Sequence, residues 1–164
     1  MSEWRLWRRF AILTAALYGF LAWFWFTQLV PGADGLIPFD GRLMGYSVAE
    51  ARAFLDALSE PARVTYLGVV RILDTVFPIC LAALLAWPLW RLPSGALRVL
   101  GMIPVAYLAA DLTENALVAG MLRSRELIAP DVIELASQIT VAKYAFLITS
   151  VIALGAVFMR TRRP

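Results

Sequence analysis

The chain has 164 residues, of which 61% are hydrophobic and 16% charged, and its mean hydropathy is +0.73. This composition excludes an ordinary soluble domain and predicts one integral membrane domain over residues 1–164. The chain has no histidine and a single cysteine, which excludes an intrachain disulfide, histidine-ligated haem or zinc, and a Ser-His-Asp triad. The net charge of +3 comes without a basic run interleaved with aromatics outside the membrane flanks, so we expect no nucleic-acid partner. We also expect no cofactor and no metal.

A segment with tryptophans and arginines opens the chain, and an apolar run follows at about residues 10–30. This run is longer than the apolar core of a signal peptide, and no small-residue cleavage site follows it. A hydrocarbon core of roughly 30 Å needs about 20 apolar residues. The sequence therefore predicts a first span that is retained.

A more polar loop at residues 31–60 comes next, and turn-forming residues occupy 31–35 and 37–41. Ser47 and Glu50 form a capping box, which predicts a short amphipathic helix at about residues 48–59. This helix is too short to cross a bilayer. We expect it to pack over the mouth of the bundle or to lie at the interface, and a lid over a site below is the alternative.

Three further apolar segments predict spans at about residues 62–90, 98–122 and 135–159. The predicted fold is thus all-α, a four-helix transmembrane bundle with a short amphipathic helix in the first external loop. Pro78 lies inside the second span. Because proline has no amide hydrogen, we expect a kink there and an Asp74 carbonyl without its usual helical donor.

The arginines predict the orientation of the spans. The side of the bundle that holds both termini has only Glu3 as an acid against eight arginines: Arg5, Arg8, Arg9, Arg91, Arg98, Arg160, Arg162 and Arg163. The other side mixes arginines with acids. By the positive-inside rule, both termini are predicted to be cytoplasmic in a bacterial inner membrane, with two external loops.

Ionisable residues within the apolar spans are the main functional signal. Asp111, Glu114 and Asn115 are spaced i, i+3, i+4 and so project from one helix face. A carboxylate near the bilayer centre costs about 2.5–3.5 kcal/mol on insertion scales, so this face must contact protein or trapped water. Helix depth predicts that seven residues meet at one level: Arg71, Asp74, Asp111, Glu114, Asn115, Thr140 and Lys143.

These seven residues carry two cations and three carboxylates, so one acid is left unmatched. Lys143 is the only lysine of the chain, and we expect it to pair with Glu114 or Asp111. Asp111 lies furthest from the external mouth, and we predict that it is the unmatched acid.

Five short motifs follow one another along the chain: Pro38-Phe39-Asp40, Arg63-x-x-Tyr66, Asp74-x-x-Phe77-Pro78, Asp111-x-x-Glu114-Asn115 and Ser137-x-x-Thr140-x-x-Lys143. With them the chain resembles a family of small four-span bacterial membrane proteins whose function has not been established. The resemblance runs from Pro38 to Lys143. It implies that the buried polar set is characteristic of the family, and it supplies no substrate.

The leading interpretation is a charged pocket in the outer half of the bundle that binds or translocates a small polar or cationic ligand. The candidate ligand-binding residues are Arg63, Tyr66, Arg71, Asp74, Asp111, Glu114, Asn115, Ser137, Thr140 and Lys143. Besides membrane lipid, the expected partners are such a ligand and either further copies of the chain or a larger membrane complex. Four short spans make a thin wall for a channel, so translocation would require an oligomer.

Two other classes of function stay open. One is a membrane-embedded enzyme acting on a lipid-like substrate, with Asp111 or Glu114 as general base, or with Ser137 or Thr140 as nucleophile and Lys143 as base. The other is a structural or accessory subunit whose buried ion pairs only determine helix packing. A cavity open to the outer surface favours a ligand or transport, one that opens sideways to lipid favours an enzyme or lipid binder, and a dry paired cluster favours structure.

Overall fold

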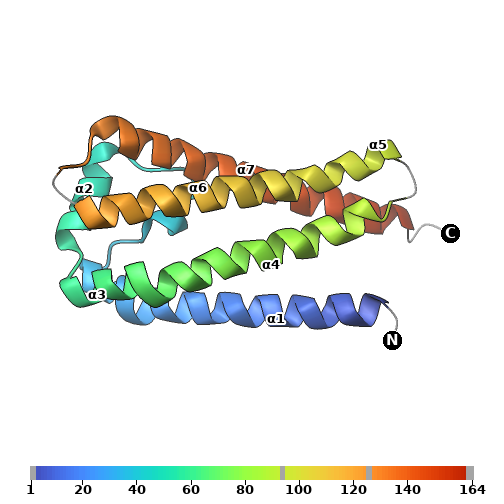
Figure 1. Cartoon of the computed structure of the whole chain (residues 1–164), viewed down its shortest axis with the longest axis horizontal. Coiled ribbons are helices and arrows are strands. Elements are labelled where there is room, and N and C mark those ends of the chain that lie inside the picture. Colours follow the sequence, from blue (N-terminus) through green and yellow to red (C-terminus); the bar gives the residue numbers. More distant parts are fainter. Residues whose placement is uncertain (1–2, 93–94, 125–126, 162–164) are drawn as a thin grey trace.

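The computed structural model describes residues 3–92, 95–124 and 127–161, and this part of the chain is built from helices and loops (Figure 1). Four helical segments are long and apolar enough to cross a membrane: Glu3–Leu29, Glu60–Trp90, Val99–Ser124 and Pro130–Met159. The chain is a multi-pass membrane protein with four spans. The predicted all-α bundle, with a short helix between the first and second spans, is confirmed.

Most spans combine a long α-helix with a shorter helical segment. The first consists of α1 (Glu3–Phe24) and a π-helical turn, η1 (Trp25–Leu29). The second consists of α3 (Glu60–Thr65), a π-helical turn η4 (Tyr66–Val70) and α4 (Arg71–Trp90). In the third, α5 (Gly95–Arg98) and a 3₁₀ turn η5 (Val99–Gly101) precede α6 (Met102–Ser124), and the fourth span belongs to α7 (Pro130–Thr161).

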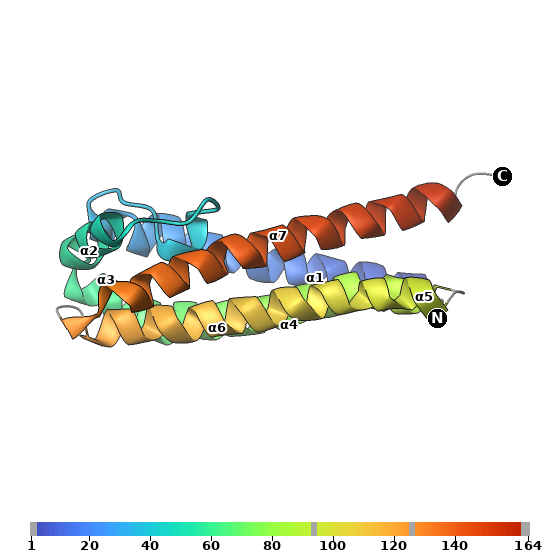
Figure 2. The ribbon, with the colours of Figure 1, turned by 90° about the horizontal axis from the view of Figure 1, so that it is seen from above.

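The packing of the four long helices leaves one gap. Helix α4 packs against α1 and α6, and α6 packs along α7, whereas α1 and α7 make little close contact with each other. Figure 2 shows α7 diverging from α4 and α6 toward its C-terminal end. There α1 and α7 meet through aromatic rings, with centroids 5.8 Å apart for Trp4 and Phe158 and 6.2 Å for Trp7 and Phe158. The bundle is thus open between α1 and α7 beyond this contact.

The segment between the first and second spans carries much of the hydrophobic core. It contains two 3₁₀ turns, η2 (Pro31–Ala33) and η3 (Phe39–Gly41), and helix α2 (Val48–Ala57). The predicted capping box is present, because Ser47 Oγ accepts from the Glu50 amide at 3.2 Å and the Glu50 carboxylate accepts from the Ser47 amide at 2.7 Å. Phe39 and Phe54 are fully buried, with ring centroids 4.9 Å apart. Their burial holds the loop on the bundle.

This loop does not merely cover the end of the bundle; it also folds back among the spans. Gly45 has a φ of +81°, and a Cβ placed on it would lie 2.6 Å from Ser137 Oγ, so a glycine is needed where the loop meets α7. The Tyr46 amide donates to Ser137 Oγ at 2.8 Å, and the Arg42 guanidinium donates to the Ile37 carbonyl at 2.9 and 3.0 Å. Non-helical backbone among membrane spans needs such partners, because lipid supplies none.

Candidate functional site

The charged cluster is centred on Lys143, which lies near the middle of the fourth span. Its Nζ is 3.1 Å from Asp40 Oδ1 and 3.3 Å from Asp111 Oδ1, and it also forms an ion pair with Glu114. All four side chains are buried. The predicted pairing of Lys143 with Glu114 or Asp111 is confirmed for both residues, and a third carboxylate joins them.

Asp40 is the site residue that the sequence prediction missed. Its Oδ2 accepts a hydrogen bond from the Tyr66 hydroxyl at 2.8 Å, and its main-chain carbonyl accepts one from the Tyr144 hydroxyl. The burial of the neighbouring Phe39 places Asp40 among the spans. The available signal was the Pro38-Phe39-Asp40 piece, but the turn residues around it predicted a loop outside the bundle.

Pro78 has the predicted consequence for the Asp74 carbonyl, but the kink of the second span lies at Gly68 and not at Pro78. The Asp74 carbonyl lacks its helical donor, and the Asn115 side chain takes that place by donating to it at 2.8 Å. The same amide group also donates to Asp111 Oδ2 at 3.2 Å. Asn115 therefore ties the kinked second span to the acidic face of α6.

Glu114 is the most enclosed of the carboxylates, with no exposed surface. The Thr140 hydroxyl donates to its Oε1, while its Oε2 meets Lys143. The hydroxyl of Tyr46, from the first loop, is close enough to Glu114 and Asp40 to be affected by their negative charges. Burial first, and then the charge of Glu114, raise the pKa of the Tyr46 hydroxyl well above its ordinary value, so this phenol stays neutral.

The unmatched acid is Asp74, and the prediction that it would be Asp111 is wrong. Asp111 contacts Lys143 and accepts from Asn115, whereas the Asp74 carboxylate has no hydrogen-bond or ion-pair partner among the described residues. Asp74 is 7% exposed and lines a cavity. The prediction failed because it ranked the acids by their distance along a span, and this distance does not determine which acid faces Lys143.

Three other candidate residues lie outside the cluster. Arg63 forms an ion pair with Glu60 at 2.5 Å and donates to the Leu122 carbonyl at 3.2 Å. The Ser137 hydroxyl accepts a hydrogen bond from the Tyr46 amide of the loop, not from a charged group. Arg71 borders a small second pocket that Asp74 and Asn115 also line, and it makes no ion pair within the described part of the chain. The predicted balance of two cations against three carboxylates is thus corrected to one ammonium against four carboxylates.

Three members of the cluster, Asp40, Asp111 and Lys143, lie on the floor of a cleft of about 500 Å³. Its polar lining comes from Asp40, Asp74, Asp111, Lys143, Tyr107 and Tyr144. Its walls are apolar and come from the first span, the loop, α4 and α7: Tyr18, Leu21, Trp25, Phe26, Val30, Ile37, Pro38, Gly41, Leu43, Phe77, Leu81 and Leu147. The cleft therefore lies where α1 and α7 are apart, and it has an acidic floor and apolar walls.

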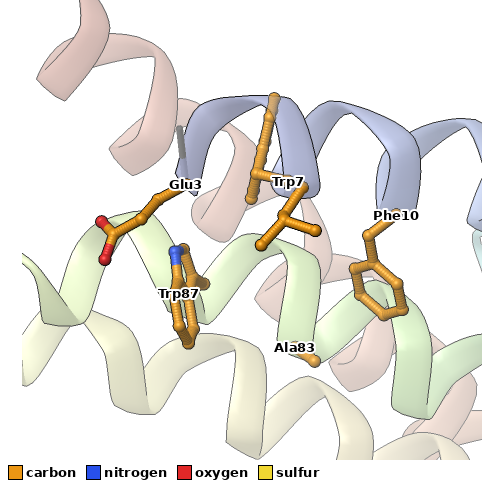
Figure 3. Close-up of a pocket in the computed structure, with 6 residues that line it drawn as sticks. Glu3, Trp7, Phe10, Ala83 and Trp87 are labelled. Carbon is orange, nitrogen blue, oxygen red and sulfur yellow. The ribbon is translucent and has the colours of Figure 1, made fainter. Parts of the chain in front are cut away.

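A second cavity of about 310 Å³ lies near the start of α1, between α1 and α4 (Figure 3). Trp7, Phe10 and Trp87 line it, and its one ionised residue is Glu3. Glu3 forms an ion pair with Arg91, so this cavity presents no unmatched charge. The cleft at Lys143 is the better candidate for a functional site.

Comparisons of the chain with protein-family models, with curated proteins and with solved structures gave no match. The family resemblance of the motifs therefore stays a prediction. The fold and the site by themselves define the class: a four-span membrane protein with a buried charged cluster of Lys143 with Asp40, Asp111 and Glu114.

Proposed function

We propose that the protein binds a small organic cation, an ammonium, in the cleft beside Asp74. The observation that carries the proposal is the charge on the cleft floor. Three carboxylates, of Asp40, Asp74 and Asp111, line it with one ammonium, which Glu114 also holds, and the Asp74 carboxylate has no partner among the described residues. A carboxylate buried without a partner is costly, and a bound cation would stabilise its ionised form.

An organic cation suits the site better than a metal ion. Lys143 already occupies the point where three carboxylates converge, and no group of three potential metal ligands is found within the described residues. Aromatic rings also line the cleft: Tyr18, Trp25, Phe26, Phe77, Tyr107 and Tyr144. A cation over an aromatic face gains about 0.5–2 kcal/mol, which favours an ammonium group among these rings.

The contacts of the cluster weigh against a serine or threonine nucleophile. The Thr140 hydroxyl donates to Glu114, and Ser137 accepts from the loop backbone. Lys143 is held by three carboxylates, which stabilise its charged form and make it a poor base. A purely structural role accounts for the contacts of Lys143 but gives no role to the unpaired Asp74 carboxylate in the cleft.

The proposed orientation places both termini in the cytoplasm of a bacterial inner membrane, with the first loop outside. Met44 in this loop is 91% exposed and offers a labelling position. In a Cys80→Ala background, Met44→Cys should react with a membrane-impermeant maleimide added to intact cells. Labelling only after the membrane is broken would reverse the proposed orientation.

The ligand class is tested by thermal unfolding of the protein in lipid nanodiscs. Ethylammonium chloride should raise the unfolding temperature above that in sodium chloride of equal ionic strength, because a ligand stabilises by RT ln(1 + [L]/Kd), about 1.4 kcal/mol at ten times Kd. Ethanol and sodium acetate are the matched neutral and anionic controls. Equal unfolding temperatures in ethylammonium and sodium would refute the proposal. Translocation of the ligand would in addition need an oligomer, which cross-linking can reveal.

A further inference from the structure

The mouth of the cleft lies within the span region of the protein. Tyr18 lies near the middle of the first span, is 57% exposed and lines the cleft. Phe26, further along the same span, is 71% exposed and lines it as well. From the other side, α7 contributes Leu147, close to the middle of the fourth span. An opening between these residues lies at the level of the spans and so faces the lipid.

At the loop end the cleft is bordered by Ile37 and Leu43, and the hydrophobic core lies behind them. Phe39, Phe54 and Leu55 are almost completely buried there. At the opposite end, Trp4 and Trp7 meet Phe158 and join α1 to α7. The gap between α1 and α7 is the part of the cleft border that lies within the spans.

We infer that the ligand is an amphiphilic amine that enters sideways from the bilayer, with its ammonium at Asp74 and its alkyl chain in the groove between α1 and α7. The inference rests on the proposed function and adds the apolar part of the ligand. The cleft floor is acidic, but Leu81 and Leu147 extend its walls along the spans away from the loop. Its volume of about 500 Å³ lies within the range of pockets that enclose ligands larger than a bare ethylammonium ion.

The test uses the full-length protein in nanodiscs and isothermal titration, with empty nanodiscs as the reference for partition into lipid. The probes are octylammonium and ethylammonium. Leu147→Trp places bulk in the groove, and Ile148→Trp is the matched control, since Ile148 is 53% exposed and does not line the cleft. We expect Leu147→Trp to weaken octylammonium binding at least tenfold and to leave ethylammonium binding within twofold. Ile148→Trp should change the affinity for neither amine.

Retained ethylammonium binding also shows that the Leu147→Trp variant is folded. Unchanged octylammonium binding in Leu147→Trp, or an equal loss of both amines, would overturn the inference, because the chain would then not occupy the groove. The proposed function fails by a different result: Asp74→Asn leaves the binding of both amines unchanged. The two failures are therefore distinguishable.

Discussion

Lys143 Nζ lies 3.1 Å from Asp40 Oδ1, although the two residues are 103 positions apart in the sequence. This ion pair connects the first loop to the middle of the fourth span. Tyr66 and Tyr144 hold Asp40 from two further sides by hydrogen bonds to its carboxylate and to its main-chain carbonyl. The loop is thus part of the charged site, and its position depends on the same charges that form the site.

Neutralising Asp40 should release the loop. Asp40→Asn removes one partner of the buried ion pair and should destabilise the protein by about 1–3 kcal/mol. Hydrogen exchange at residues 37–46 should become faster. Asp34→Asn is the matched control, because Asp34 is exposed in the same loop and has a φ of 52°, which asparagine tolerates well. Equal exchange in the two variants would contradict the anchoring role of Asp40.

Removing the Lys143 ammonium alone should destabilise the protein more than removing it together with one acid. Lys143→Met leaves four carboxylates without a cation and should destabilise by about 3–5 kcal/mol. Adding Glu114→Gln to it should recover part of that loss, since the most enclosed carboxylate is then neutral. A double-mutant cycle on unfolding free energies measures the coupling between the two residues. Additive losses would mean that Lys143 and Glu114 are not energetically paired.

The hydrogen bond from Asn115 to the Asp74 carbonyl should contribute to stability only because Pro78 removes the usual helical donor. Asn115→Ala leaves this buried carbonyl without a donor and should cost about 1–3 kcal/mol. Pro78→Ala restores an amide at the position that normally bonds the Asp74 carbonyl. In that background Asn115→Ala should cost less than half as much. The same cost in both backgrounds would show that Asn115 acts through another contact.

The capping box predicts a pH dependence confined to α2. Hydrogen bonds from the Ser47 backbone and hydroxyl lower the pKa of Glu50 below its ordinary value of 4.5. A lowered folded-state pKa gives stability that is present above the unfolded-state pKa and is lost as pH falls through the folded-state pKa. Protection of the α2 amides should therefore exceed that of Glu50→Gln near pH 6, and the difference should vanish in acid. A difference that persists at pH 2 would contradict this assignment.

Apolar length and local chemistry were enough to predict the spans, the capping box and the consequence of Pro78. Each of these depends on residues close together in the sequence. The contacts of Lys143 with Asp111 and Glu114 also followed, because the helix period places those acids on one face at a similar depth. These predictions needed no knowledge of how the loop folds.

The parts of the site that could not be predicted depend on long-range packing. Asp40 enters the cluster because the aromatic core around Phe39 draws its loop inward. Asp74 is unpaired, and Arg71 makes no ion pair among the described residues, because of how the kinked span faces its neighbours. The sideways opening follows from the separation of α1 and α7, which hydropathy alone cannot predict.

The central claim is that Asp74 is the acid that a cationic ligand neutralises, and the most direct measurement is ethylammonium titration of Asp74→Asn in nanodiscs. A hydrogen bond to a charged group contributes about 1.5–3 kcal/mol, so binding should weaken at least tenfold. The variant should unfold no earlier than the parent, because it loses a carboxyl group that is buried without a partner. Asp111→Asn, which removes a Lys143 partner, should unfold earlier, and Asp131→Asn at an exposed position should change neither property. Unchanged ethylammonium affinity in Asp74→Asn, together with a clear loss of stability, would contradict the account.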